Sequence, residues 1–315
     1  MPTVLLLCVT AFDSNPAASP KIAAGLQESK PTAKTKTKEA PKLKPGKPIE
    51  RETAAGQTHE YRLKLGAGEF ARVTVQQLGV DVSLKLTGSN GEQLAEVNNK
   101  KSRDESETLL FIAEAKGSYL LEVSAAKEAE ESKEAAEAGA KRYRAEMTEP
   151  RAATEQDRNR VAAERKHSEA DLLRADKKPE SFKQATQKYQ DALTLWRGAK
   201  DRQREADALG GLGATFSLLN EHQQARDQYN QALAIRRELG DRKGEASALG
   251  NLGFVHNSMR QYKEALGFYE LEMEIRRETG DERRQANALT NIGQVHYLLR
   301  DFGKSVERLD QALPL

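Results

Sequence analysis

A block of 40 residues repeats through the C-terminal part of the chain and constrains the fold more than any other feature. The blocks begin at Asp201, Asp241 and Asp281, and placing one over another aligns their residues in columns. A leucine or isoleucine followed directly by glycine recurs in all three blocks. Such self-similarity indicates small units that stack and bury one another's apolar faces.

Each block is predicted to form two helices. Apolar and small residues recur at spacings of three and four over 241–259 and again over 261–278, which indicates one buried face per helix. A turn is expected near Arg260. Gly240 can adopt the left-handed conformation that often ends a helix, and Asp241 directly after it can cap the next helix.

One column of glycine falls inside the first helix of each block, at Gly213, Gly253 and Gly293. Glycine in a helix costs about 1 kcal/mol against alanine. Because this cost recurs at the same place in every unit, we expect a neighbouring helix to approach closely there.

These columns resemble the tetratricopeptide repeat family. The residues that carry the resemblance are Leu212-Gly213-Phe216 with Ala225 and Tyr229, then Leu252-Gly253 with Ala265 and Tyr269. The period of 40 exceeds the usual 34, as in the long-helix variants of kinesin light chains, and histidine replaces the aromatic residue at positions 256 and 296. Matching residues at 185–193 suggest a degenerate first unit from about Thr154, so residues 151–315 are expected to form about four helix pairs, the last one truncated.

Residues 48–150 show a different pattern, in which apolar residues alternate with polar ones. Such alternation with turn signals between predicts short antiparallel strands packed as a sandwich. The predicted strands lie at 61–65, 73–75, 82–86, 109–113, 119–123 and 142–147. The run 125–140 is rich in Ala, Glu and Lys without an apolar stripe, and is predicted to be an exposed insertion. The fold class is therefore a jelly-roll-like β-sandwich followed by an all-α solenoid.

The sandwich region resembles the modules of the bacterial pre-peptidase C-terminal (PPC) kind. The resemblance rests on Pro48-Ile49-Glu50-Arg51, Tyr61-Arg62-Leu63, Val73-Thr74-Val75 and the Gly117-Ser118-Tyr119 turn. The order of sandwich, polar helix and long repeats is in turn similar to the N-terminal part of bacterial proteins that end in a caspase-like CHAT protease domain.

The first 47 residues fall into two segments. Residues 1–20 contain a short apolar run and then small residues, the pattern of a secretory signal peptide that lacks its basic start; the alternatives are export to the cell envelope or a cytoplasmic protein. Residues 21–47 are rich in lysine and proline and predict a disordered linker. Its lysines lack interleaved aromatics, so no nucleic-acid partner is expected. No run is long enough to span a membrane.

The sequence holds no pattern that predicts catalysis, a cofactor or a metal site. Cys8 is the only cysteine, and no nucleophile, base and acid can be assembled from spacing. His256 and His296 share a column and are read as packing residues, the alternative being a metal pair or pH switch. The protein is therefore predicted not to be an enzyme.

The resemblance to tetratricopeptide repeats implies a peptide or protein partner in a concave groove lined by the first helix of each pair. In that family an asparagine just before the Leu-Gly pair often contacts the bound backbone, and Gly211 departs from this rule. The candidate groove residues are Asn251, Asn257, Asn287, Asn291, Gln294 and Tyr297.

Two functions follow as alternatives. The first is a non-enzymatic scaffold that binds a partner through this groove. The second is the regulatory region of a CHAT-type protease whose catalytic domain would follow Leu315 in cis. Leu309, Leu313 and Leu315 of the last, incomplete block would leave apolar surface uncovered, which suggests a fragment.

Overall fold

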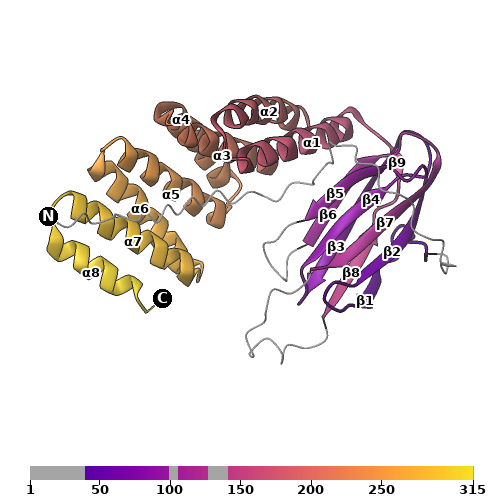
Figure 1. Cartoon of the computed structure of the whole chain (residues 1–315), viewed down its shortest axis with the longest axis horizontal. Coiled ribbons are helices and arrows are strands. Elements are labelled where there is room, and N and C mark those ends of the chain that lie inside the picture. The colour runs from indigo at the N-terminus through magenta and orange to yellow at the C-terminus, as the bar shows by residue number, and fades with distance from the viewer. Residues whose placement is uncertain (1–39, 99–105, 127–140, 315) are drawn as a thin grey trace. The chain divides into compact units, whose positions relative to one another are not determined.

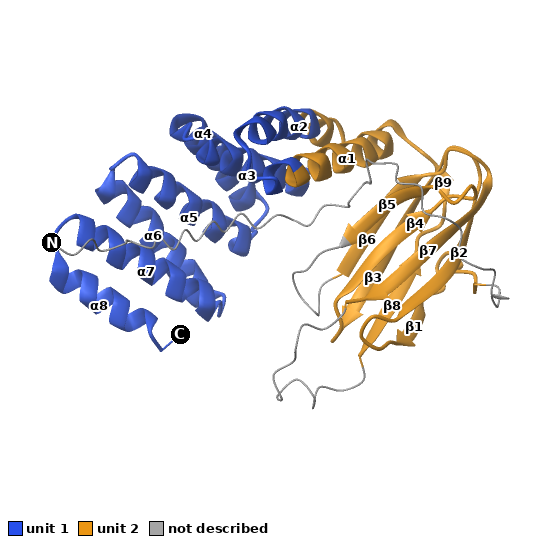
Figure 2. Cartoon of the chain, viewed as in Figure 1, with its two compact units in different colours: residues 1–16, 173–193, 201–315 blue, residues 17–172, 194–200 orange. Residues whose placement is uncertain are grey.

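In a computed structural model of the protein, residues 40–98, 106–126 and 141–314 are described. Within these residues, all strands precede all helices (Figure 1). The chain divides into two compact units (Figure 2). One contains the described residues up to Leu172 together with Thr194–Lys200, and the other contains Leu173–Leu193 and the residues from Asp201 onward.

The first unit contains a sandwich of two antiparallel sheets. One sheet has the order β1-β8-β3-β6, with β9 also paired to β3, and the other has the order β2-β7-β4-β5. The strands are Ile49–Glu52 (β1), Thr58–Leu65 (β2), Glu69–Leu78 (β3), Val82–Thr87 (β4), Gln93–Asn98 (β5), Ser106–Ile112 (β6), Gly117–Ala125 (β7), Arg142–Met147 (β8) and Arg151–Ala152 (β9). The antiparallel β-sheet region expected from the alternating pattern is confirmed.

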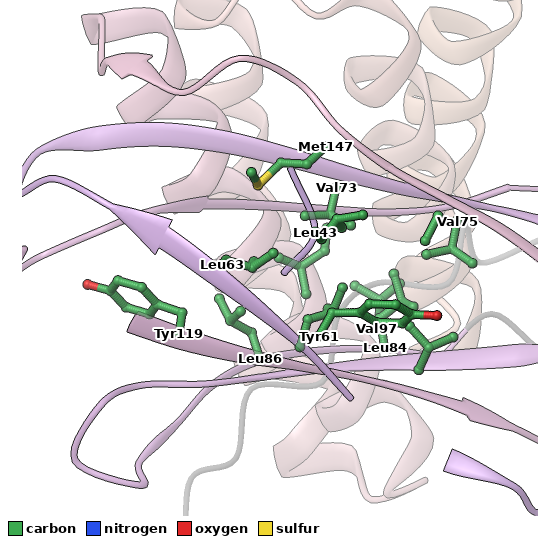
Figure 3. Packing of buried hydrophobic residues seen from close by; sticks show 14 of the residues in the cluster. Leu43, Tyr61, Leu63, Val73, Val75, Leu84, Leu86, Val97, Tyr119 and Met147 are labelled. Atoms are coloured by element: carbon green, nitrogen blue, oxygen red, sulfur yellow. The ribbon is translucent and has the colours of Figure 1, made fainter. Parts of the chain in front are cut away.

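The core of the sandwich follows from this alternation. Every second residue of β4 and β8 is buried, because successive side chains of a strand point to opposite faces of its sheet. The inward-facing residues of both sheets meet in one apolar cluster, in which Tyr61, Leu84 and Val73 are fully buried (Figure 3). The strands β1, β5 and β9 were not predicted, because they are short or weakly alternating.

The prediction of a disordered linker over 21–47 is wrong for its last part, which the structure describes from residue 40. Leu43 is buried in the sandwich core (Figure 3). Its backbone N–H donates to the Arg62 carbonyl at 3.1 Å, and the Arg62 N–H donates to the Pro41 carbonyl at 2.9 Å. The prediction failed because it rested on the composition of the segment, which is rich in lysine and proline. One leucine is enough to anchor its last residues in the core. The expected signal peptide and most of the expected insertion lie outside the described residues.

Eight helices follow in the described chain. They are Glu155–Ala175 (α1), Pro179–Gly198 (α2), Arg202–Leu218 (α3), His222–Glu238 (α4), Arg242–Ser258 (α5), Tyr262–Glu278 (α6), Glu282–Leu298 (α7) and Phe302–Ala312 (α8). The predicted pairing holds, since α3 packs on α4, α5 on α6 and α7 on α8. We call α3, α5 and α7 the A helices and α4, α6 and α8 the B helices.

The start of α1 is fixed by a hydrogen-bonded cap within the first unit. The Asp157 carboxylate accepts from the Thr154 N–H at 2.9 Å, and the Asp157 N–H donates to the Thr154 hydroxyl at 3.2 Å. This reciprocal arrangement is a capping box with aspartate in the place of glutamate. Arg151, which is in β9, donates to both oxygens of the same carboxylate at 2.6 and 2.9 Å.

The turns of the array repeat as the helices do. Gly240 and Gly280 have φ of 66° and 67° at the ends of α4 and α6, as their sequence position predicts. Asp241 and Asp281 then accept hydrogen bonds from the N–H groups of the first turn of the next helix. Within the α5–α6 hairpin the left-handed residue is Arg260, with φ of 61°.

The glycine column marks a close approach of the two helices inside each hairpin. A Cβ added at Gly213 would lie 2.8 Å from the ring of Tyr229, and one at Gly253 would lie 2.7 Å from the ring of Tyr269. At Gly293 the neighbour is Leu309, at 3.0 Å. Tyr229, Tyr269 and Leu309 share one column, so the expected repetition of the contact is confirmed.

Within the described residues, none of the helices is both long and apolar enough to cross a membrane.

Candidate functional site

The six predicted groove residues lie on two A helices. Asn251 and Asn257 are on α5, and the other four are on α7. All of them are half-buried except Tyr297, whose side chain is exposed. Asn287, Asn291 and Gln294 follow each other at spacings of four and three, and therefore share one side of α7.

Asn251 and Asn291 occupy the same place in successive hairpins. Each directly precedes a buried pair, Leu252-Gly253 or Ile292-Gly293, that faces the B helix. Among the described residues neither side chain has a hydrogen-bond partner. Each amide therefore offers two donors and one acceptor to a ligand from a fixed, half-buried position.

Gly211 stands where an asparagine would continue this column, and the structure gives the reason. A Cβ at Gly211 would lie 2.6 Å from the ring of Tyr189, in α2. Tyr189 is fully buried. The ring occupies the space that a side chain at position 211 would need, so the column of amides begins only at α5.

Asn257 and Tyr297 lie at the edge of the side of the A helices that carries Asn251 and Asn291. Asn257 is seven residues after Gly250, so the two share a flank of α5, and a Cβ at Gly250 would contact the Glu272 carboxylate of α6. The Asn257 Oδ1 is buried and has no partner among the described residues. Tyr297, in the same column, packs edge-on against Phe302 of α8, with ring centroids 5.5 Å apart.

The column of Asn287 has a structural role in the two earlier hairpins. Its counterparts are Asp207 and Ser247. Asp207 accepts a hydrogen bond from Arg236 of α4, and Ser247 accepts one from Arg276 of α6 at 2.8 Å. Position 287 therefore belongs to a column that joins the A and B helices of a hairpin.

Arginines near the ends of α4 and α6 join consecutive hairpins. Arg236 also donates to Asp241 at 2.5 Å, and Arg237 donates to Glu245 at 2.8 Å, so both reach the next A helix. Burial by itself would raise the pKa of Asp241, but the Gly244 N–H and the charge of Arg236 bring that pKa below its ordinary value. In the next hairpin Arg276 donates to Asp281 at 3.4 Å in the same way.

The histidine column lies at a packed position, where His256 is half-buried and His296 is buried. The ring of His256 lies 4.9 Å from that of Phe268, centroid to centroid. Burial lowers the pKa of His256, which keeps the ring neutral. In the parts of the chain that the structure describes, no three His, Cys, Asp or Glu side chains are grouped to hold a metal ion.

The geometry defines a class of protein, a stack of helical hairpins. Its A helices carry half-buried polar side chains, and each B helix packs against the A helix of its hairpin. Residues 180–238 and 244–315 match the family model "Tetratricopeptide repeat". This part of the chain is therefore similar to tetratricopeptide repeats, a type of helical scaffold that is consistent with protein–protein interaction. A search of curated proteins gave no match.

Solved structures of similar fold cover part of the chain. BtubC from P. vanneervenii is 21% identical over 48% of this chain and 63% of its own, with a TM-score of 0.43. Aspartyl phosphate phosphatase F from Bacillus subtilis is 16% identical over 49% of this chain and 40% of its own, with a TM-score of 0.45. The TPR domain of Arabidopsis FLU is 21% identical over 36% of this chain and 95% of its own, with a TM-score of 0.35.

Proposed function

We propose that the protein is a non-enzymatic scaffold that binds a peptide or protein partner along its A helices. The observation that carries the proposal is the pair Asn251 and Asn291. They are two half-buried amides at one repeat position, and neither has a partner among the described residues. Spaced by one hairpin, they suit the repeating N–H and C=O groups of a peptide backbone.

Half-burial favours this use of the two asparagines. An amide held between packed helices has lost much of its side-chain freedom before a ligand arrives, so less entropy is lost on binding. We define the A-helix face as Asn251, Asn291 and Gln294, with Asn257, Asn287 and Tyr297 at its margin. Asn287 and Gln294 widen the set of polar contacts along α7.

The proposal can be tested with peptides selected from a random display library against the full chain. Their affinity would be compared between the wild type, the double variant Asn251→Ala with Asn291→Ala, and Asn230→Ala. Asn230 is an exposed residue of α4 and serves as the matched control. Two lost hydrogen bonds of about 1 kcal/mol each should weaken binding about tenfold or more, while the control should bind as the wild type. Equal affinity in all three proteins would remove the A-helix face from the proposal.

A second candidate is a regulatory region of a CHAT-type protease, acting on a catalytic domain in cis. Support comes from the order of sandwich, polar helix α1 and repeats along the chain. Under this proposal the coding sequence after Leu315 contains a domain with a catalytic His and Cys. A stop codon after one or two more repeats would favour the scaffold instead.

We also propose 48–150 and 151–315 as the limits of the two domains. The fragment 151–315 should then fold on its own and give a helical circular dichroism spectrum, and a fragment without that helical signal would contradict these limits.

A further inference from the structure

A pocket of about 430 Å³ lies between the B helices α6 and α8. Its apolar surface comes from Leu271 and Met273 of α6 and from Ile292 of α7. Leu271 is a large apolar side chain left 45% exposed. Gly267 borders the same pocket, and a Cβ there would meet no other atom within 4 Å. The volume falls within the range of sites that take a small ligand or a buried side chain.

Four charged side chains also line the pocket: Glu270, Glu274, Arg277 and Arg308. None of them forms an ion pair with another described residue. Arg308 is half-buried, and its Nε–H is shielded from solvent without a hydrogen-bond acceptor. One of its terminal nitrogens donates to Gln311 at 3.1 Å. A buried donor without an acceptor is unfavourable, so an oxygen brought to Arg308 Nε by a ligand would be bound favourably.

Two residues of this pocket differ from their counterparts one hairpin earlier. Arg308 of α8 stands in the column of Phe268 of α6, and Phe268 packs against His256. Leu271 likewise stands in the column of Gln231. Between α6 and α8 an arginine therefore stands where the α5–α6 hairpin has an aromatic ring, and an exposed leucine stands where the α3–α4 hairpin has a glutamine.

We propose that this pocket binds one aromatic side chain of a partner peptide, together with an adjacent carboxylate that pairs with Arg308. The ring packs against Leu271, Met273 and Ile292, and the carboxylate accepts from Arg308 Nε. Glu270 and Glu274 oppose a second negative charge, so the segment carries a single acid beside its aromatic residue. The site is separate from the A-helix face, and its test does not depend on that face.

The probe for this site is 3-phenylpropionate, a ring joined to one carboxylate, with 3-phenylpropanol as the uncharged comparison. The full chain would be labelled with ¹³C at its methionine methyl groups. Met273 lines the pocket, whereas Met147 lies in the sandwich core and serves as an internal reference. The expected result is a saturable shift of the Met273 signal at millimolar probe, an unchanged Met147 signal, and about tenfold tighter binding of the acid than of the alcohol.

Three variants make the test specific. Arg308→Phe places in α8 the ring that α6 carries, and Gly267→Phe fills the pocket from the other side. Both should abolish the Met273 shift, and the unchanged Met147 signal reports that the sandwich is intact. Arg308→Gln should keep the site open and remove the preference for the acid. The proposal is overturned if Met273 does not shift in the wild type, if its shift persists in both phenylalanine variants, or if acid and alcohol bind equally.

Discussion

The contact between the glycine column and the B-helix ring gives the sharpest prediction about stability. Gly253→Ala adds a Cβ that would lie 2.7 Å from both Cδ1 and Cε1 of Tyr269, a ring that is only 2% exposed. Real Cβ atoms do not come this close, so either the ring or α5 must move. Overpacking of this kind costs about 1–3 kcal/mol.

The same substitution also raises helix propensity, and the two effects must be separated. Alanine in place of glycine inside a helix contributes about 1 kcal/mol of stability. Gly210 offers the matched control, because it lies in the middle of α3 and a Cβ there would meet nothing within 4 Å. Gly210→Ala should therefore stabilise the array by about 1 kcal/mol, whereas Gly253→Ala should be neutral or destabilise it by up to about 2 kcal/mol.

The quantity to compare is the difference in the free energy of unfolding between the two variants, about 1–3 kcal/mol. Urea unfolding followed by circular dichroism at 222 nm reports on the helices in the full chain. Adding Tyr269→Leu to Gly253→Ala should recover part of the loss, since a leucine holds this column opposite Gly293. Equal stabilisation by Gly253→Ala and Gly210→Ala would refute the close contact.

Two further predictions concern ionisable groups of the first unit. The hydrogen bonds from Arg151 and from the helix cap hold the pKa of Asp157 well below its ordinary 3.8, so its contribution is present above about pH 4 and is lost as the pH falls further. Asp157→Asn should cost about 2 kcal/mol at pH 7; a difference from wild type in urea unfolding that fails to shrink towards pH 2 would contradict this. Burial, and then a nearby arginine, lowers the pKa of His59 below 6.5, and its Nδ1 lies 2.7 Å from the Tyr143 hydroxyl. The stability that the neutral ring contributes is full above pH 6.5 and falls below it, so near-UV circular dichroism in urea should show an acid-sensitive sandwich that His59→Gln makes less sensitive.

The repeats were predictable because their signal is redundant. Each column appears in two or three blocks, so the glycine contacts, the caps at Asp241 and Asp281, and the packing role of His256 all followed from alignment of the chain with itself. The sandwich was predictable where apolar residues alternate over a whole strand. It was not predictable at β5 or β9, or at Leu43, whose burial depends on a single side chain reaching a distant core.

The candidate site was only partly predictable. Spacing placed Asn251 and Asn291 in one column, but it could not show that their amides lack partners while Ser247 has Arg276 as a donor. Nor could it show that Tyr297 packs against Phe302 of its own B helix. These contacts depend on side chains of other helices. The spacing of residues along one helix gives no information about them.

Hydrogen–deuterium exchange of the full chain, with and without a selected peptide, tests most directly the claim that the A helices bind the partner. Ligand contact at Asn251 and Asn291 should slow the exchange of α5 and α7 and leave the sandwich strands unchanged. Protection confined to the sandwich or to the B helices α4 and α6 would contradict the account.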